Sequence, residues 1–213
     1  MSHSRIVVLI CSVFALQGCA LFSKGEVTMR RYYTPELSAI RPSQAHSSSE
    51  LRLGRVTAGV YISERIMFRE SAYEVGFYDD RIWTEKPEAY LRRGLGRVLF
   101  EEQGLRSVVR GAGPTLDVEL ISFEEVKAPQ HIGRVKLSFA LSDERVVSLQ
   151  QTITVDRPII EQSPKNASTE ASAVAQAMGE ALRDAIYEVS NRVVGDLAKA
   201  PGAISPCPVA TAP

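Results

Sequence analysis

The stretch GRVKLSFALSDERVVSLQQTITVDRP, residues 133–158, decides the fold because it alternates apolar and polar residues on both sides of a polar turn. Apolar positions in its first half are Val135, Leu137, Phe139 and Leu141, and those in its second half include Val147, Leu149, Ile153 and Val155. Successive side chains of a strand point to opposite faces of the sheet. The stretch therefore predicts an antiparallel hairpin with one covered face and one face toward water.

The rest of the chain supplies further strands and two helices. Patterns typical of strands cover residues 27–34, 50–62, 71–78 and 114–127, with a bulge expected at Gly54 and a phase slip before Phe123. One helix is expected after Thr84, with Thr84 as its cap, Pro87 in its first turn and Gly104 at its end. A long amphipathic helix is expected over residues 169–197. This order predicts an α+β fold, a largely antiparallel sheet with two helices packed on one face.

The N-terminal segment has the features of an export signal. Arg5 precedes an apolar run over residues 6–16, too short to span a bilayer comfortably as a helix, and small residues follow. The sequence Leu16-Gln17-Gly18-Cys19 resembles the bacterial lipobox, in which the peptidase cleaves before a cysteine that carries a diacylglycerol. We expect a signal peptide over 1–18, a short tether over 19–28 after lipidated Cys19, one domain over 29–198 and a disordered tail over 199–213. Because Ala20, not Asp, follows the cysteine, outer-membrane anchoring facing the periplasm is favoured over inner-membrane anchoring.

Composition argues against several classes of function. Lysine plus arginine and aspartate plus glutamate both number 25, so no basic excess attracts nucleic acid. The three cysteines, at positions 11, 19 and 207, form neither a metal-ligand spacing nor a disulfide framework, and the state of Cys207 stays open. The chain has no phosphate-binding loop and no Gly-x-Ser-x-Gly elbow. We expect no metal, no cofactor and no enzymatic activity.

The sequence YEVGFYDDRIWTEKPEAYLRRGL, residues 73–95, holds the strongest candidate for chemistry. Asp79 and Asp80 come between an expected strand and an expected helix, a place where active sites occur. Adjacent strand residues point apart, however, so the two carboxylates are not expected to converge. Arg81 can pair with either acid, and Trp83 precedes the helix as a packing residue. We interpret Asp79, Asp80, Arg81 and Trp83 as a structural corner rather than a catalytic pair.

These segments together resemble the auxiliary lipoproteins of ABC-type transport systems, including those that accompany MCE lipid transporters of the paraquat-inducible type. The resemblance rests on FYDDRIWTEKPEAYLRRGLGRVLFEE (77–102), PTLDVELISFEEV (114–126), TVDRPI (154–159), the alanine-rich last helix and the lipobox at Cys19. It implies a non-enzymatic subunit that docks the MCE assembly at the outer membrane and supports lipid transfer and envelope integrity. The implied partners are an MCE-domain periplasmic protein, an ABC permease and ATPase, and membrane lipids through acylated Cys19.

Three further hypotheses stay open at this stage. An exposed sheet edge invites assembly of a homo-oligomer. A lipoprotein regulator of peptidoglycan synthases is the alternative function, although about ten residues between Cys19 and the first strand form a short tether for crossing the wall. A periplasmic hydrolase would need a nucleophile and a base, which the sequence does not place together.

Overall fold

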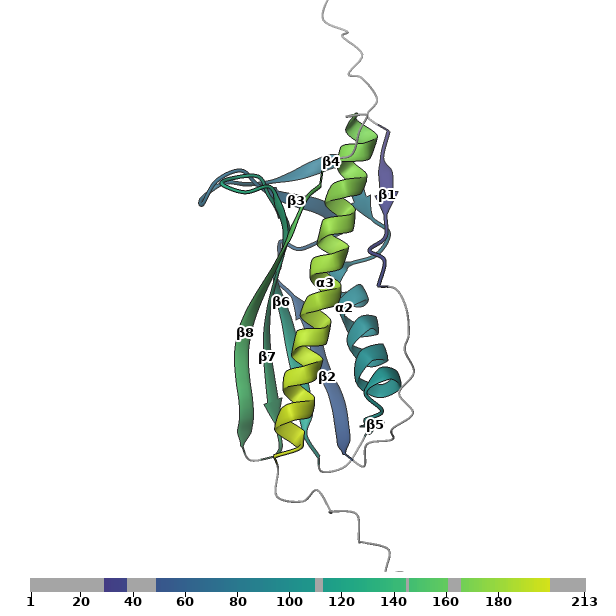
Figure 1. Ribbon diagram of the computed structural model, residues 1–213, viewed down its shortest axis with the longest axis vertical. Helices are drawn as coiled ribbons and strands as arrows, with labels where there is room; N and C mark the ends of the chain where they lie inside the picture. The colour runs from purple at the N-terminus through teal and green to yellow at the C-terminus, as the bar shows by residue number, and fades with distance from the viewer. Residues whose placement is uncertain (1–28, 38–48, 110–112, 145, 161–165, 200–213) are drawn as a thin grey trace, which may run out of the picture.

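Two helices lie on one face of a curved sheet in the computed structural model (Figure 1), which describes residues 29–37, 49–109, 113–144, 146–160 and 166–199. Within these ranges the strands are β1 (Arg31–Tyr33), β2 (Glu50–Ala58), β3 (Arg65–Arg69), β4 (Val75–Trp83), β5 (Arg106–Ser107), β6 (Thr115–Val126), β7 (Ile132–Ser142) and β8 (Val147–Pro158). The helices are α2 (Pro87–Gly96), the π-helical turn η2 (Arg97–Glu102) and α3 (Ala167–Leu197). The predicted α+β class is confirmed. The predictions for 1–18, Cys19, the tether over 19–28 and residues 200–213 lie outside the described residues.

The long strand β6 is the centre of the sheet. One edge of β6 pairs along its whole length with antiparallel β7, which pairs in turn with antiparallel β8. The other edge is shared by β2 and β3, and both of these run parallel to β6. Strand β1 is also parallel to its neighbour β4. The longest ladders are antiparallel, as predicted, and the shorter parallel pairings were not indicated by the sequence.

Two irregularities expected from the sequence are present. The β2–β6 register shifts between Leu53 and Val56, at the predicted bulge near Gly54. The Arg55 N–H there donates to Asp117 Oδ1 at 2.6 Å, and a Cβ on Gly54 would meet that same oxygen at 2.4 Å. The β6–β7 register shifts between Leu120 and Ser122, where the phase slip was predicted. These bulges bend the sheet around the helices.

The core lies between the sheet and the two helices. Strand β7 alternates as expected: Val135, Leu137, Phe139 and Leu141 are buried and the residues between them are only half-buried. Helix α3 crosses β7 so closely that a Cβ on Gly133 would lie 2.7 Å from the backbone N of Met178. Only a residue without a side chain fits there. The small residues of α3 permit this approach, because its buried face is rich in alanine.

The helix ends partly contradict the sequence predictions. Thr84 was expected to cap the first helix, but the N-cap of α2 is Lys86, which makes no side-chain cap bond, and Pro87 follows it. The helix then widens into the turn η2 before Gly104, whose positive φ of 69° ends it as predicted. Helix α3 begins at a capping box, with the Asn166 side chain accepting from the Thr169 N–H at 2.9 Å. None of the described helices is both long and apolar enough to cross a membrane.

Candidate functional site

The four residues singled out in the sequence belong to the end of a strand, not to a loop. All of them lie within β4, and the turn toward α2 begins only at Thr84. The expectation that Asp79 and Asp80 come between strand and helix is therefore wrong. Asp79 is exposed and its Oδ1 accepts from Arg65 Nη2 at 2.5 Å, whereas Asp80 is half-buried and shares no partner with it. The two carboxylates do not form an acid–base pair.

Trp83 anchors the corner in the core. Its side chain is 1% exposed, and its ring stacks on Phe123 of β6 with centroids 5.0 Å apart. Tyr90 of α2 contacts the same indole edge-to-face at 6.4 Å. The Tyr90 hydroxyl accepts the Glu85 N–H at 3.0 Å and lies 2.7 Å from Thr84 Oγ1, so Thr84 fixes the turn instead of capping the helix. Strand, turn and helix are thereby held together around one tryptophan.

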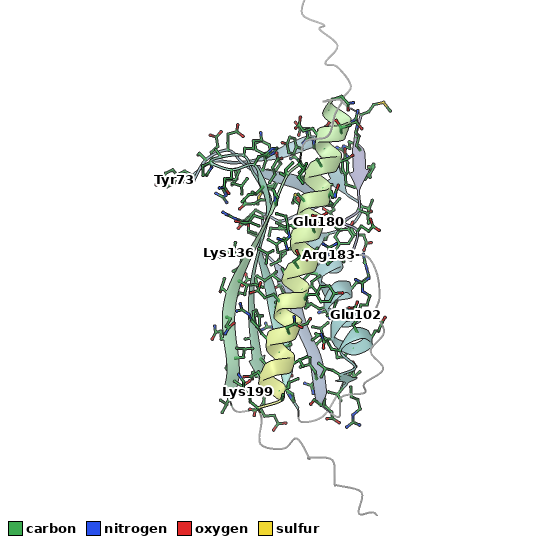
Figure 2. All side chains as sticks on the ribbon, viewed as in Figure 1. Tyr73, Glu102, Lys136, Glu180, Arg183 and Lys199 are labelled. Atoms are coloured by element: carbon green, nitrogen blue, oxygen red, sulfur yellow. The ribbon has the colours of Figure 1, made fainter. Side chains whose placement is uncertain are left out.

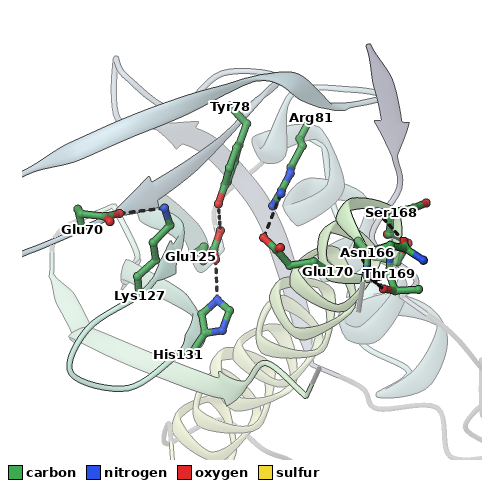
Figure 3. Close-up of polar contacts among 11 residues, drawn as sticks. Glu70, Tyr78, Arg81, Glu125, Lys127, His131, Asn166, Ser168, Thr169 and Glu170 are labelled. Carbon is green, nitrogen blue, oxygen red and sulfur yellow. Dashed lines mark hydrogen bonds and ion pairs between the residues drawn. The ribbon is translucent and has the colours of Figure 1, made fainter. Parts of the chain in front are cut away.

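Arg81 joins this corner to the start of α3. Its guanidinium stacks on the Tyr78 ring, with Cζ 3.8 Å from the centroid, and Nη2 donates to Glu170 Oε1 at 3.1 Å (Figure 3). The sequence had suggested Asp79 or Asp80 as its partner, and that suggestion is wrong. A register shift between β3 and β4 places Tyr78 and Arg81 on the same face although they are three residues apart. Arg81 is buried, and its Nη1 has no hydrogen-bond partner.

A second polar group, which the sequence did not reveal, is the Glu125 cluster of Tyr78, Glu125 and His131 (Figure 3). Glu125 is 1% exposed; one carboxylate oxygen accepts the Tyr78 hydroxyl at 2.8 Å, and the other lies 2.6 Å from His131 Nε2. Burial, followed by the charge of Glu125, raises the pKa of Tyr78 well above its usual range. Both oxygens of the carboxylate are thus occupied within the protein.

The neighbouring Glu124 is buried as well, on the opposite face of β6. It is 2% exposed and accepts from Arg69 Nε at 3.1 Å and from the Ser122 hydroxyl at 2.6 Å. Both acids of the FEEVK segment are thus buried, on opposite faces of β6. No sequence signal distinguishes them, because their burial depends on Arg69 and Tyr78 from distant strands.

A third polar group lies under η2. The Tyr187 hydroxyl of α3 donates to Glu102 Oε2 at 2.6 Å, and this bond to a carboxylate raises the pKa of Tyr187. Arg97 Nε lies 3.4 Å from Glu102 Oε1, and Arg97 Nη2 donates to the Leu37 carbonyl. The Glu102 side chain is only 7% exposed. The contacts tie η2 to α3 and to the segment after β1.

The chemistry available at these groups is limited by how they are paired. Each buried carboxylate described above accepts from an arginine, a phenol or a hydroxyl, or lies against a histidine ring nitrogen. Among the described residues, no group of three His, Cys, Asp or Glu side chains is arranged to hold a metal ion. These paired side chains form contacts that join β3, β4 and β6 to the two helices.

Comparisons with known proteins yield solved structures alone: no family model and no curated protein matches the sequence. A protein from Xanthomonas campestris, described under the family model DUF330, is 22% identical with a TM-score of 0.63, covering 78% of this chain and 96% of its own. A hypothetical protein from Chlamydia trachomatis is 10% identical with a TM-score of 0.50, covering 71% and 98%. A minor lipoprotein from Acinetobacter baumannii is 10% identical, covering 71% and 95%, but its TM-score of 0.44 is too low to carry an argument. The first two similarities establish a shared fold.

Proposed function

We propose that this chain is a non-catalytic lipoprotein of the bacterial envelope, anchored through Cys19 in the outer membrane and facing the periplasm. The observation that carries the proposal is the lipobox at residues 16–19, in front of a domain whose buried Glu124 and Glu125 carboxylates already accept hydrogen bonds from other side chains. A catalytic site generally keeps at least one reactive group open to a substrate. Here the corner residues hold strands and helices together instead.

The finer proposal is that the lipoprotein serves an ABC transport system of the MCE type. Its role would be to dock the MCE assembly at the outer membrane, where lipid passes between the assembly and the membrane. The order of lipobox, corner, β6 segment and alanine-rich helix supports this role. The corner adds a rigid element, because it is built around buried Trp83. Because this chain lacks a phosphate-binding loop, ATP hydrolysis would belong to a partner.

The free edge of β8 supports assembly into a homo-oligomer as part of the same proposal. Among the described strands, β8 pairs with β7 alone, so one side of this 12-residue strand has no strand partner. Unpaired strand edges favour pairing with another chain. Light scattering of the purified protein would show a mass above that of the monomer, and a monomer across a wide concentration range would contradict the oligomer.

The test of the transport role is site-specific photo-crosslinking in intact cells, followed by affinity purification and mass spectrometry. Photo-reactive residues would replace Tyr73 at the tip of the β3–β4 hairpin, Arg92 on the outer face of α2 and Thr152 on β8, all of which are exposed (Figure 2 labels Tyr73). Recovery of an MCE protein with its permease supports the proposal. Recovery of peptidoglycan synthases without transport subunits would replace it with the regulator alternative.

The matched control for the anchor is Cys19→Ser in the same cells. If Cys19 is acylated, the wild-type protein sediments with membranes and the Cys19→Ser variant does not. A wild-type protein found free in the periplasm would contradict the lipoprotein assignment itself, independently of which partners are recovered.

A further inference from the structure

The first described residues form an exposed surface at one end of the molecule. This N-terminal patch consists of Met29, Arg30, Arg31 and Tyr32; Met29 is 81% exposed, Tyr32 is 63% exposed, and both arginines are exposed. The following Tyr33 is half-buried and packs against the core, which fixes β1 to the domain. The patch thus combines two cations, one aromatic ring and one flexible apolar side chain at the start of β1 and in the two residues before it.

The patch lies at the end of the molecule where α3 begins. Figure 1 shows β1 beside the first turns of α3, far from the C-terminal end of that helix. The pairing of β1 with β4 supports this position of β1. Arg31 lies opposite Arg81 of β4, and Arg81 reaches Glu170 in the first turn of α3. Strand β1 pairs only with β4 among the described strands, so its other edge is open.

The local charge at this end is positive. Glu170, the acid of the first helical turn, is already engaged by Arg81, and no described carboxylate pairs with Arg30 or Arg31. The N-terminus of a long helix adds roughly half a positive charge. The patch therefore presents two exposed guanidinium groups with no ion pair to a described carboxylate, beside a positive helix end, a combination that attracts phosphate oxygens.

The length of chain before the patch limits where it can lie. Met29 lies ten positions after Cys19, and a chain of that length spans at most about 35 Å when fully extended. If Cys19 is acylated, the patch can never be farther than that from the bilayer. The short distance keeps its effective concentration at the membrane surface high.

We propose that the N-terminal patch lies directly on the phospholipid surface that holds the acylated Cys19, with Arg30 and Arg31 on anionic headgroups and Tyr32 at headgroup depth. This inference rests on the lipidation proposed above. Tyrosine is enriched at membrane–water interfaces because its ring is apolar and its hydroxyl is polar. Each arginine near an anionic surface favours the contacting state about fivefold, and added salt screens this attraction. The acyl chains thus anchor the protein, and the patch sets its orientation.

The test places a fluorescent probe at two ends of the full-length, acylated protein. The variants are Met29→Cys in the patch and Lys199→Cys beyond the far end of α3 (Lys199 is labelled in Figure 2), both in a Cys207→Ser background. An acylated Cys19 thiol cannot react with the maleimide probe, and intact-mass measurement reports acylation separately. The protein is placed in vesicles of phosphatidylethanolamine and phosphatidylglycerol that contain a lipid with a nitroxide headgroup.

The expected result is strong nitroxide quenching of the probe at position 29 and little at position 199. Replacing both arginines (Arg30→Gln and Arg31→Gln) shifts the contact equilibrium about 25-fold toward release, and high salt weakens the wild-type contact. Equal quenching at both positions, or none at position 29 in a protein that carries its acyl chains, would overturn the orientation but leave the anchor intact. A chain without acyl groups would overturn the proposed lipidation as well.

Discussion

The close approach of α3 to β7 yields a quantitative prediction for Gly133→Ala. The new Cβ would lie 2.7 Å from the backbone N of Met178 and 2.9 Å from the carbonyl carbon of Ala177, about 1 Å short of an ordinary contact. Both atoms belong to the helix backbone, so no side-chain rotation relieves the overlap and α3 must move away from the sheet. Overpacking of this kind costs about 1–3 kcal/mol, and the stiffer unfolded chain returns about 0.4–1 kcal/mol.

We therefore expect the free energy of unfolding of Gly133→Ala to fall by about 1 kcal/mol, which lowers Tm by about 2–4 °C in a domain of this size. Urea unfolding followed by fluorescence measures it directly, because Trp83 is the only tryptophan and is buried. Gly195→Ala in the last turns of α3 is the matched control: no atom lies within 4 Å of its Cβ position, so up to about 1 kcal/mol of stabilisation is expected. Equal urea midpoints for the two variants would refute the close-packing argument.

Four further predictions concern the corner and the Glu125 cluster. Trp83→Ala should lower the free energy of unfolding by about 3–5 kcal/mol. Asp80→Asn should change it by less than about 0.5 kcal/mol. A folded Asp80→Asn protein that fails to complement an envelope defect would revive the hydrolase hypothesis. Arg81→Lys should cost about 1–2 kcal/mol, because an ammonium cannot stack flat on Tyr78 while reaching Glu170. The pKa of Tyr78 is raised in the folded state, so above about pH 10 the unfolded chain loses a proton that the folded chain keeps, and stability falls with rising pH. Tyr78→Phe should flatten that decline in a series of urea midpoints, and an unchanged slope would contradict the raised pKa of Tyr78.

Several parts of the fold could be predicted because they depend on local pattern. Alternation in β7 indicated which residues face the helices, and the phase slip before Phe123 marked a real bulge. Gly104 and Pro87 act through their own backbone restrictions, so their effect on helix ends is visible in the sequence. Trp83 is buried against Tyr90 of α2, and a large apolar residue beside a helix start commonly packs on that helix.

The polar groups of the site could not be predicted, because each depends on strands that the sequence does not align. Glu125 is buried because β3 and β4 return to the same end of β6 and bring Tyr78 over it. Arg81 finds Glu170 only because a register shift in β4 turns its side chain toward α3. Sequence neighbours suggested Asp79 and Asp80 as partners, yet the neighbour in space is 89 residues away.

The arrangement of these groups also bears on where partners can bind. Helix α3 has 31 residues and is therefore about 46 Å long, and its N-terminal turn lies beside the proposed membrane patch. If the patch rests on the bilayer with α3 upright, the far end of the helix reaches well into the periplasm. The exposed face of β7 and β8 would then stand along the membrane normal, open to an assembly approaching from the inner membrane. Crosslinks to an MCE protein from Thr152 of β8 but not from Met29 would agree with that orientation, and the reverse pattern would contradict it.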